Sequence, residues 1–284
     1  MSESVPKMTK NEKSPSENDD RLLRVVFFAA LMLLVIEMNP IISGVFYGTD
    51  LYELVVTGLF FLTFGLIYFI VLGFIRWEGG SSISELGIDL EDDEFFPHLA
   101  IGAIAGSVAA ILVVVIAFLF GGTLRPTSAI TPDLIAGEII ITVPTALFEE
   151  LAYRGYLTTR LVDIIGKGRG IIISSLFFGL LHFGWWTPLG TVPIHLILLF
   201  TLNLTLGGIV LSYAYYWSGN KLWVPIAFHF MWNMIAYLLF PTFPRDPVLM
   251  PEIYQIEWGV TTIAGFLFGL SIIWILLNPT KRKK

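Results

Sequence analysis

Residues 133–160 read DLIAGEIIITVPTALFEELAYRGYLTTR, an apolar run that contains two adjacent glutamates and an arginine near its centre. The run exceeds the length of about 20 helical residues that crosses the roughly 30 Å hydrocarbon core of a bilayer. Glu149, Glu150 and Arg154 therefore lie within a predicted transmembrane helix. Because an ionised side chain is costly in hydrocarbon, such residues usually face a wet cavity or pair with one another. This segment predicts a membrane-embedded helix with a functional site on it.

The composition of the whole chain also indicates a membrane protein. Of its 284 residues, 55% are hydrophobic and 14% are charged, and the mean hydropathy is +0.77. Ordinary soluble domains carry roughly 25% charged residues. Further apolar runs lie at 22–46, 52–75, 97–120, 170–183, 190–217, 221–240 and 256–277. We therefore predict an all-α polytopic membrane protein, with about eight transmembrane helices in one bundle around a central cavity that is accessible from the cytoplasm. The short run at 170–183 is expected to be a tilted or partial span.

The basic residues predict the orientation of the bundle. If the N-terminus is cytoplasmic, the cytoplasmic loops and tails hold most of the 17 Lys and Arg residues, including the final KRKK at 281–284. Cytoplasmic loops of membrane proteins carry such an excess. We therefore predict a multi-pass protein of the cell membrane with both termini in the cytoplasm.

The chain is expected to form one helical membrane domain, with no soluble catalytic module. We predict a disordered cytoplasmic tail at 1–20, a membrane domain at 21–278 with its catalytic core at about 133–240, and a basic cytoplasmic tail at 279–284. The absence of cysteine excludes thiol catalysis and Cys-ligated zinc. The net charge of −6 argues against nucleic acid as a partner. The lipid bilayer is the expected surrounding.

Helical geometry separates the two adjacent glutamates. Glu150 and Arg154 are four residues apart and share a face, so an internal ion pair can hold both charges away from water. Glu149 lies about 100° around the helix from Glu150. We therefore predict that Glu150 and Arg154 support the structure, whereas Glu149 faces another part of the site.

Further polar residues lie at membrane depth on two other predicted helices. His182 ends the run SSLFFGLLHFG, and His229 and Asn233 share one helical face in AFHFMWN. A rise of about 1.5 Å per residue from the basic residues at the membrane edge places Glu149 and these three side chains about 12–20 Å deep. A carboxylate and an imidazole can deprotonate a water molecule, and an imidazole and an amide can stabilise an oxyanion. The four residues together predict a hydrolytic site.

Three short motifs in this region resemble those of a known family. EELAYRG (Glu149 to Gly155), FGLLH (Phe178 to His182) and HFMWN (His229 to Asn233) are similar to the EExxxR, FxxxH and HxxxN motifs of the CPBP family. This family contains the type II CAAX prenyl proteases and the bacteriocin-processing intramembrane endopeptidases. The resemblance covers about residues 140–235, with the motifs in the family's order on three separate helices.

The resemblance implies an intramembrane glutamic endopeptidase that cuts a peptide bond near the C-terminus of a lipidated or hydrophobic protein or peptide. It leaves open whether the substrate is prenylated. By analogy, Glu149 and His182 would activate the hydrolytic water, and His229 and Asn233 would stabilise the oxyanion. The structural supports would be Glu150, Arg154 and Phe178.

A zinc site on Glu149, His182 and His229 is an alternative, since two histidines and a glutamate form a known catalytic set. The sequence lacks the HExxH spacing that places two ligands and a base on one helix. A metal-free site also accounts for Asn233, so we expect no cofactor. The same polar layer would also suit a proton-coupled transporter, or a non-catalytic membrane adaptor or immunity protein.

Other polar residues are weaker candidates. Glu138 lies three turns before Glu149 and could face the same cavity, although a position near the outer membrane edge is preferred. His195 is expected to be a structural histidine near the outer end of its helix. His98, beside the acidic loop that precedes its helix, is expected to be solvated.

Overall fold

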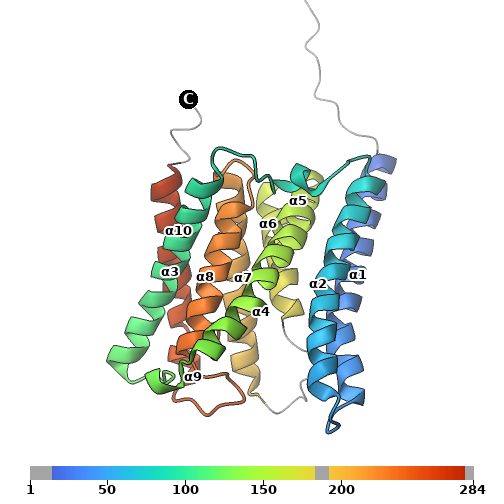
Figure 1. Ribbon diagram of the computed structural model, residues 1–284. Coiled ribbons are helices and arrows are strands. Elements are labelled where there is room, and N and C mark those ends of the chain that lie inside the picture. Colours follow the sequence, from blue (N-terminus) through green and yellow to red (C-terminus); the bar gives the residue numbers. More distant parts are fainter. Residues whose placement is uncertain (1–14, 183–191, 279–284) are drawn as a thin grey trace, which may run out of the picture.

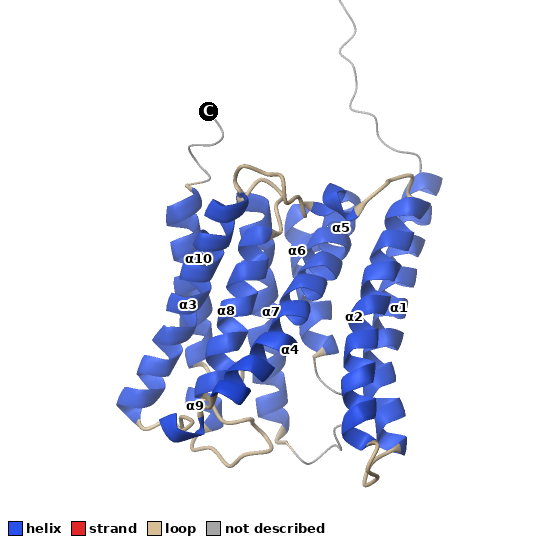
Figure 2. Ribbon diagram, in the orientation of Figure 1, coloured by secondary structure: helices blue, strands red, loops and turns tan. Residues whose placement is uncertain are grey.

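The structure is a computed structural model that describes residues 15–182 and 192–278. All regular secondary structure in these ranges is helical, and no strand occurs in them (Figure 2). This confirms the predicted all-α class. Residues 1–14 and 279–284, which make up most of the predicted tails, lie outside the described residues.

The helices follow the predicted apolar runs closely. In chain order they are α1 (Pro15–Val45), α2 (Tyr52–Trp77), α3 (Phe95–Phe120), α4 (Pro132–Glu150), α5 (Thr159–Ile165), α6 (Lys167–Leu181), α7 (Ile194–Trp217), α8 (Trp223–Leu239), α9 (Pro251–Tyr254) and α10 (Thr261–Leu277). A π-helical segment, Leu151–Thr158, joins α4 to α5. Short 3-10 turns lie at Ile83–Leu86 and Thr127–Ala129. α1 already begins within the segment predicted to be a tail.

Several of these helices have the length and composition of membrane spans. Four are long and apolar enough to cross a membrane, at Asp19–Val45, Tyr52–Trp77, Phe95–Phe120 and Ile194–Trp217. Trp223–Leu239 and Thr261–Leu277 are shorter apolar helices. Large apolar side chains such as Leu34, Phe69 and Leu198 are exposed on the outside of the bundle, as lipid-facing positions require. The protein is therefore a polytopic membrane protein, and the full number of spans stays a prediction.

α6 is too short to cross a bilayer by itself. Its 15 residues extend roughly 22 Å at 1.5 Å per residue, against a hydrocarbon core of about 30 Å. Figure 1 shows that it ends partway along the bundle. The residue that follows its last turn is His182, so the truncation of α6 places this histidine inside the protein.

The bundle has two sides, with α4 between them. α1 and α2 form a hairpin on one side, and α3, α8 and α10 pack together on the other (Figure 1). One buried apolar cluster includes Phe28, Phe74 and Tyr156, and a second includes Val113 and Phe228. α4 crosses obliquely between the two sides (Figure 1), so its C-terminal end lies in the interior of the molecule.

Small residues allow the central helices to approach closely. A Cβ atom on Gly179 of α6 would lie 2.8 Å from the Thr201 carbonyl oxygen of α7. A Cβ atom on Gly208 of α7 would lie 2.8 Å from the Cβ atom of Ser175. Small residues at such contacts are typical of packed membrane helices. The contacts fix α6 against α7 and thereby fix the position of His182.

The prediction for His98 was wrong. Its side chain is only 1% exposed, and its Nε2 atom lies 3.5 Å from a carboxylate oxygen of Glu94. The loop before α3 folds back onto the start of α8, where Trp223 Nε1 donates a hydrogen bond to the Asp89 carbonyl at 3.0 Å. This long-range contact covers the edge of the bundle, and no local sequence pattern indicates it.

Candidate active site

The predicted ion pair between Glu150 and Arg154 is present. Arg154 Nη1 donates to Glu150 Oε1 at 2.8 Å, and both side chains are almost fully buried. A buried charge without a partner would be strongly destabilising, so each residue depends on the other. Glu150 is the last residue of α4, and Arg154 lies in the π-helical segment that follows.

The π-helical segment is a feature that α-helical periodicity does not predict. It runs over eight residues, Leu151–Thr158, and all eight are buried. π-Helices are rare and frequently occur at functional sites. Here the segment begins one residue after Glu150, where the site residues of α4 end.

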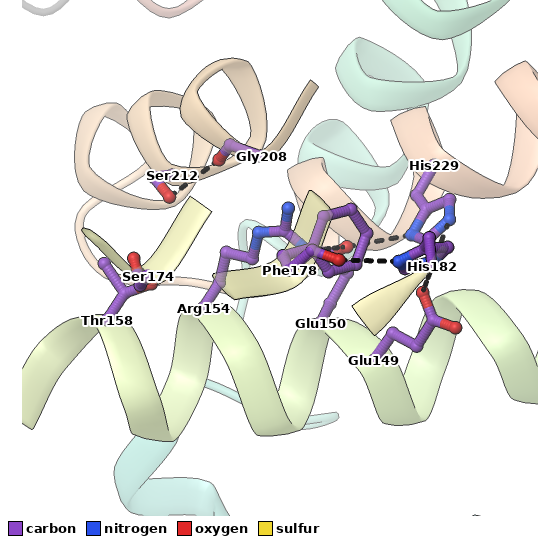
Figure 3. A network of polar contacts seen from close by, with 10 residues as sticks. All are labelled: Glu149, Glu150, Arg154, Thr158, Ser174, Phe178, His182, Gly208, Ser212 and His229. Atoms are coloured by element: carbon purple, nitrogen blue, oxygen red, sulfur yellow. Dashed lines mark hydrogen bonds and ion pairs between the residues drawn. The ribbon is translucent and has the colours of Figure 1, made fainter. Parts of the chain in front are cut away.

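Glu149 faces both candidate histidines. Its Oε2 atom lies 3.6 Å from His182 Nε2 and 3.9 Å from His229 Nε2. Figure 3 shows the three side chains converging. The three residues come from α4, the end of α6 and α8. The structure thus brings together three of the four residues expected in one layer, and it places the two adjacent glutamates in different surroundings.

The hydrogen bonds of His182 fix the role of each ring nitrogen. Its Nδ1 atom lies 2.7 Å from the carbonyl oxygen of Phe178. Because a carbonyl only accepts hydrogen bonds, Nδ1 carries a proton, and in the neutral ring Nε2 is an acceptor. The gap of 3.6 Å between Nε2 and Glu149 Oε2 is too long for a good direct hydrogen bond. A water molecule beside these two atoms would be within reach of both.

His229 has a second carboxylate partner that sequence analysis missed. Its Nδ1 atom lies 2.8 Å from Glu150 Oε1, the same oxygen that accepts from Arg154. The sequence assigned Glu150 to Arg154 alone. The sequence predicted no contact between Glu150 and His229, because the rotation of α8 about its own axis decides it. Asn233 lies one turn further along α8 and is buried.

Phe178 contacts both Arg154 and His182. Its ring centroid lies 4.2 Å from the guanidinium carbon of Arg154 and 4.3 Å from the ring centroid of His182. An aromatic face stabilises a nearby cation, more so where water is excluded. Phe178 thus lies between the charge of Arg154 and the imidazole of His182 (Figure 3), and its supporting role stays a prediction.

A cavity of about 290 Å³ adjoins the polar layer, and we call it the main cavity. All four predicted catalytic residues line it. Most of its remaining lining is apolar or aromatic. This lining includes Phe60, Phe64, Ile141, Leu204, Leu211, Phe228, Trp232 and Phe266. An apolar pocket with a few converging polar groups is the usual form of a binding site.

The main cavity extends from the polar layer away from the chain termini. On α4 its lining continues from Glu149 back to Ile141, and on α8 it continues to Tyr237. In Figure 1 these directions lead away from the edge where α1 begins and α10 ends. On the terminal side of the layer, the buried Tyr153 and Tyr156 fill the bundle. This differs from the expected combination of cytoplasmic termini with a cytoplasm-accessible cavity, which stays a prediction.

A second cavity, of about 180 Å³, reaches the layer from the side of α1 and α2. Its lining includes Ile36, Asn39, Ile67, Tyr153 and Leu181. Glu149 and His182 line both cavities. Glu149 and His182 therefore lie where the two cavities meet.

Glu257 is a further polar residue of the main cavity, and sequence analysis missed it. It lies between α9 and α10, in a segment with no motif. Glu138 and His195, the weaker sequence candidates, do not line either cavity. The other candidate site residues were recognised as polar residues inside apolar runs. Glu257 lies in a loop, so its polarity did not distinguish it.

The geometry does not favour the alternative zinc set. Among the residues that the structure describes, no three His, Asp or Glu side chains form a group that could hold a metal ion. Glu149, His182 and His229 therefore do not form such a group, and no catalytic step here is assigned to a metal. The expectation that the protein uses no cofactor stays a prediction.

The structure is thus a polytopic helical bundle in which a carboxylate, two imidazoles and an amide line a mostly apolar cavity. Residues 131–235 match the model of the family described as Rce1-like, type II CAAX prenyl endopeptidase. This match confirms the resemblance indicated by the three motifs, and it includes every predicted catalytic residue. The central part of the chain is therefore similar to the Rce1-like family of proteases. No match was found among the curated proteins with which the sequence was compared.

Proposed function

We propose that this protein is a glutamic intramembrane endopeptidase that cuts a peptide bond near the C-terminus of a lipidated or hydrophobic protein or peptide. The observation that supports this most strongly is the separation of 3.6 Å between Glu149 Oε2 and His182 Nε2, at a point that two cavities share. A peptide that extends from one cavity into the other would pass this pair with its scissile bond next to both side chains.

In the first step, Glu149 and His182 hold a water molecule, and Glu149 removes one of its protons. The water oxygen attacks the carbonyl carbon of the scissile peptide bond. A new carbon–oxygen bond forms, and the electron pair of the carbonyl double bond moves to its oxygen. His182 is held for this task by its hydrogen bond to the Phe178 carbonyl.

In the tetrahedral intermediate, His229 and Asn233 stabilise the oxyanion. Nδ1 of His229 faces Glu150 at 2.8 Å, so Nε2 is the atom left for the substrate. In this step Nε2 must carry a proton as well, so that it donates a hydrogen bond to the oxyanion together with the amide of Asn233. Collapse of the intermediate breaks the carbon–nitrogen bond, and Glu149 returns its proton to the leaving amine.

The lining of the cavities supports a hydrophobic substrate. Phe60 and Phe64 line both cavities, and Trp232 and Phe266 line the main one. Apolar side chains or a lipid chain would gain free energy by filling these spaces. The Rce1-like family match supports a CAAX-type substrate, and a prenyl group is one lipid that this lining suits.

The positive residues support a placement in the cell membrane with both termini in the cytoplasm. The proposed reaction uses only side chains of this chain and one water molecule. It requires no metal, and nucleic acid has no part in it.

Peptide cleavage by the purified protein in lipid nanodiscs tests this function. We expect cleavage of a hydrophobic C-terminal peptide at a single bond, identified by mass spectrometry, and undiminished activity after exhaustive chelation. Prenylated and unprenylated forms of one peptide separate the two substrate classes. No cleavage of either form, or activity that only added zinc restores, would contradict the proposal.

A further inference from the structure

Glu257 occupies a position that the proposed mechanism does not use. It lies between α9 (Pro251–Tyr254) and α10 (Thr261–Leu277), outside the region that matches the Rce1-like family. Its backbone φ is +67°, which is an uncommon conformation for any residue with a side chain. Such outliers often mark functional positions when the surrounding structure holds them in place.

Buried polar side chains hold the backbone of Glu257 on both sides. Asn203 Nδ2 donates to the Glu257 carbonyl oxygen at 2.9 Å and to the Gly259 carbonyl oxygen at 3.0 Å. The Glu257 N–H donates to Thr262 Oγ1 at 2.8 Å. Asn203 and Thr262 are both fully buried. The loop is thus fixed to α7 and α10, and the unusual backbone conformation is built into the fold.

This fixed backbone directs the Glu257 side chain into the main cavity, where it completes the lining with the catalytic layer. Trp232, His182 and His229 line the same cavity. No lysine or arginine is present among the residues that line this cavity in the described structure. Two acidic side chains, Glu149 and Glu257, and two histidines therefore line the cavity.

A purely structural role explains this arrangement poorly. The neighbouring cavity wall is aromatic, and an apolar residue at position 257 would pack against it without the cost of placing a carboxyl in a half-buried site. The backbone hydrogen bonds from Asn203 and to Thr262 do not depend on which side chain position 257 carries. What the carboxyl adds is an acceptor for a positively charged group inside a mostly apolar pocket.

We propose that Glu257 is a specificity residue that binds a basic side chain of the peptide substrate, a lysine or an arginine close to the cleaved bond. This inference rests on the proposed endopeptidase function, since it assigns a substrate feature to the same site. Glu149 acts on the water, whereas Glu257 recognises the substrate and makes or breaks no bond. The remaining aromatic lining receives the apolar part of the same peptide.

Peptides that differ at one position test the proposal. We would measure kcat/KM for a hydrophobic peptide with lysine, norleucine or glutamate at each position near the cleaved bond. At one position the native protein should prefer lysine over norleucine by roughly tenfold or more. Glu257→Gln should abolish that preference, and Glu257→Lys should shift it towards glutamate. The matched control is Glu252→Gln, in α9 just before this loop and outside the lining of the main cavity, which should keep the lysine preference.

Binding separates this inference from the proposed function. In the Glu149→Gln background, the lysine peptide labelled with a fluorophore should bind more tightly than the norleucine peptide, and the additional change Glu257→Gln should remove the difference. If the native protein cleaves no peptide, the proposed function fails, and this binding comparison still decides the role of Glu257. Equal binding of the two peptides at every position, or a lysine preference that survives in Glu257→Gln, would overturn the inference.

Discussion

At the scale of single residues, the site depends on the different surroundings of two adjacent glutamates. Glu149 is 16% exposed and faces two imidazoles, whereas Glu150 is fully buried between Arg154 and His229. In the proposed mechanism Glu149 acts on the water, whereas Glu150 is held by its contacts with Arg154 and His229. Substitution of Glu149 should therefore lower activity, whereas substitution of Glu150 should lower stability.

Arg154→Met tests whether the contacts of Glu150 stabilise the fold. The substitution leaves the fully buried Glu150 without its cationic partner, and such a change typically costs about 3–5 kcal/mol. We expect a large drop in unfolding free energy, measured by denaturant titration in detergent micelles. Arg160→Met is the matched control, because Arg160 pairs with Glu78 at a partly exposed position and should cost less. Equal losses in the two variants would contradict the account.

The sequence located the site residues by depth, but it did not predict their contacts. Polarity within apolar runs was enough to group Glu149, His182, His229 and Asn233. The contact between Glu150 and His229 depends on the rotation of α8 and on the π-helical segment after α4, and neither follows from a periodic pattern. The sequence did not predict that Glu257 lines the cavity, because its position is set by hydrogen bonds from Asn203 and to Thr262.

At the scale of helices, close packing of α3 on α8 positions His229. A Cβ atom on Gly106 of α3 would lie 2.9 Å from the Cα atom of Phe228, the residue before His229. We predict that Gly106→Ala lowers the unfolding free energy by about 1–3 kcal/mol, as overpacking does, and lowers peptide cleavage as well. Thermal unfolding and cleavage rates of the purified variant measure both effects.

Gly73→Ala on α2 is the control for this prediction, since no atom lies within 4 Å of a Cβ built on Gly73. The greater helix propensity of alanine should make this variant as stable as the native protein, or more stable by up to about 1 kcal/mol. If Gly106→Ala behaves like Gly73→Ala, the close contact of α3 with α8 does not determine the position of His229.

The loop before α3 is held to the start of α8 by an ion pair that should respond to pH. Lys221 Nζ lies 2.6 Å from Asp92 Oδ2, and this hydrogen-bonded ammonium lowers the pKa of Asp92, with further help from the Glu94 backbone N–H. Because the pKa is lower in the folded state, the pair stabilises the protein above the unfolded pKa of about 3.9. This contribution is lost as the pH falls through the folded pKa.

We therefore predict that Asp92→Asn lowers the melting temperature at neutral pH, and that the difference from the native protein disappears once the pH falls below the folded pKa of Asp92. Thermal unfolding across a pH series checks this. Asp93→Asn, at the exposed neighbouring position, serves as the control. If the melting temperature of Asp92→Asn fell further below that of the native protein as the pH falls, this prediction would be contradicted.

At the scale of the whole molecule, the apolar runs predicted the helices well because length and hydropathy are sufficient for that purpose. They did not predict where the main cavity runs, since this depends on how the helices tilt and which side chains fill each end. The cavity extends away from the edge that carries the termini. The orientation of the chain therefore decides from which side of the membrane a substrate approaches.

Cysteine labelling tests the orientation, and the chain has no native cysteine to interfere. Glu91→Cys lies on the edge with the termini, and Ser128→Cys lies in the loop between α3 and α4. With cytoplasmic termini, an impermeant maleimide should label Ser128→Cys in intact cells and Glu91→Cys only after permeabilisation. The opposite pattern would place both termini outside and would reverse the predicted orientation.

The most direct test of the central claim is the rate of peptide cleavage by Glu149→Gln in lipid nanodiscs. The substitution keeps the size of the side chain but removes the base next to His182. We predict a loss of at least about 10²-fold in kcat, the scale of general base catalysis, with a melting temperature close to that of the native protein. A folded Glu149→Gln variant that cleaves the peptide within a few-fold of the native rate would contradict the account.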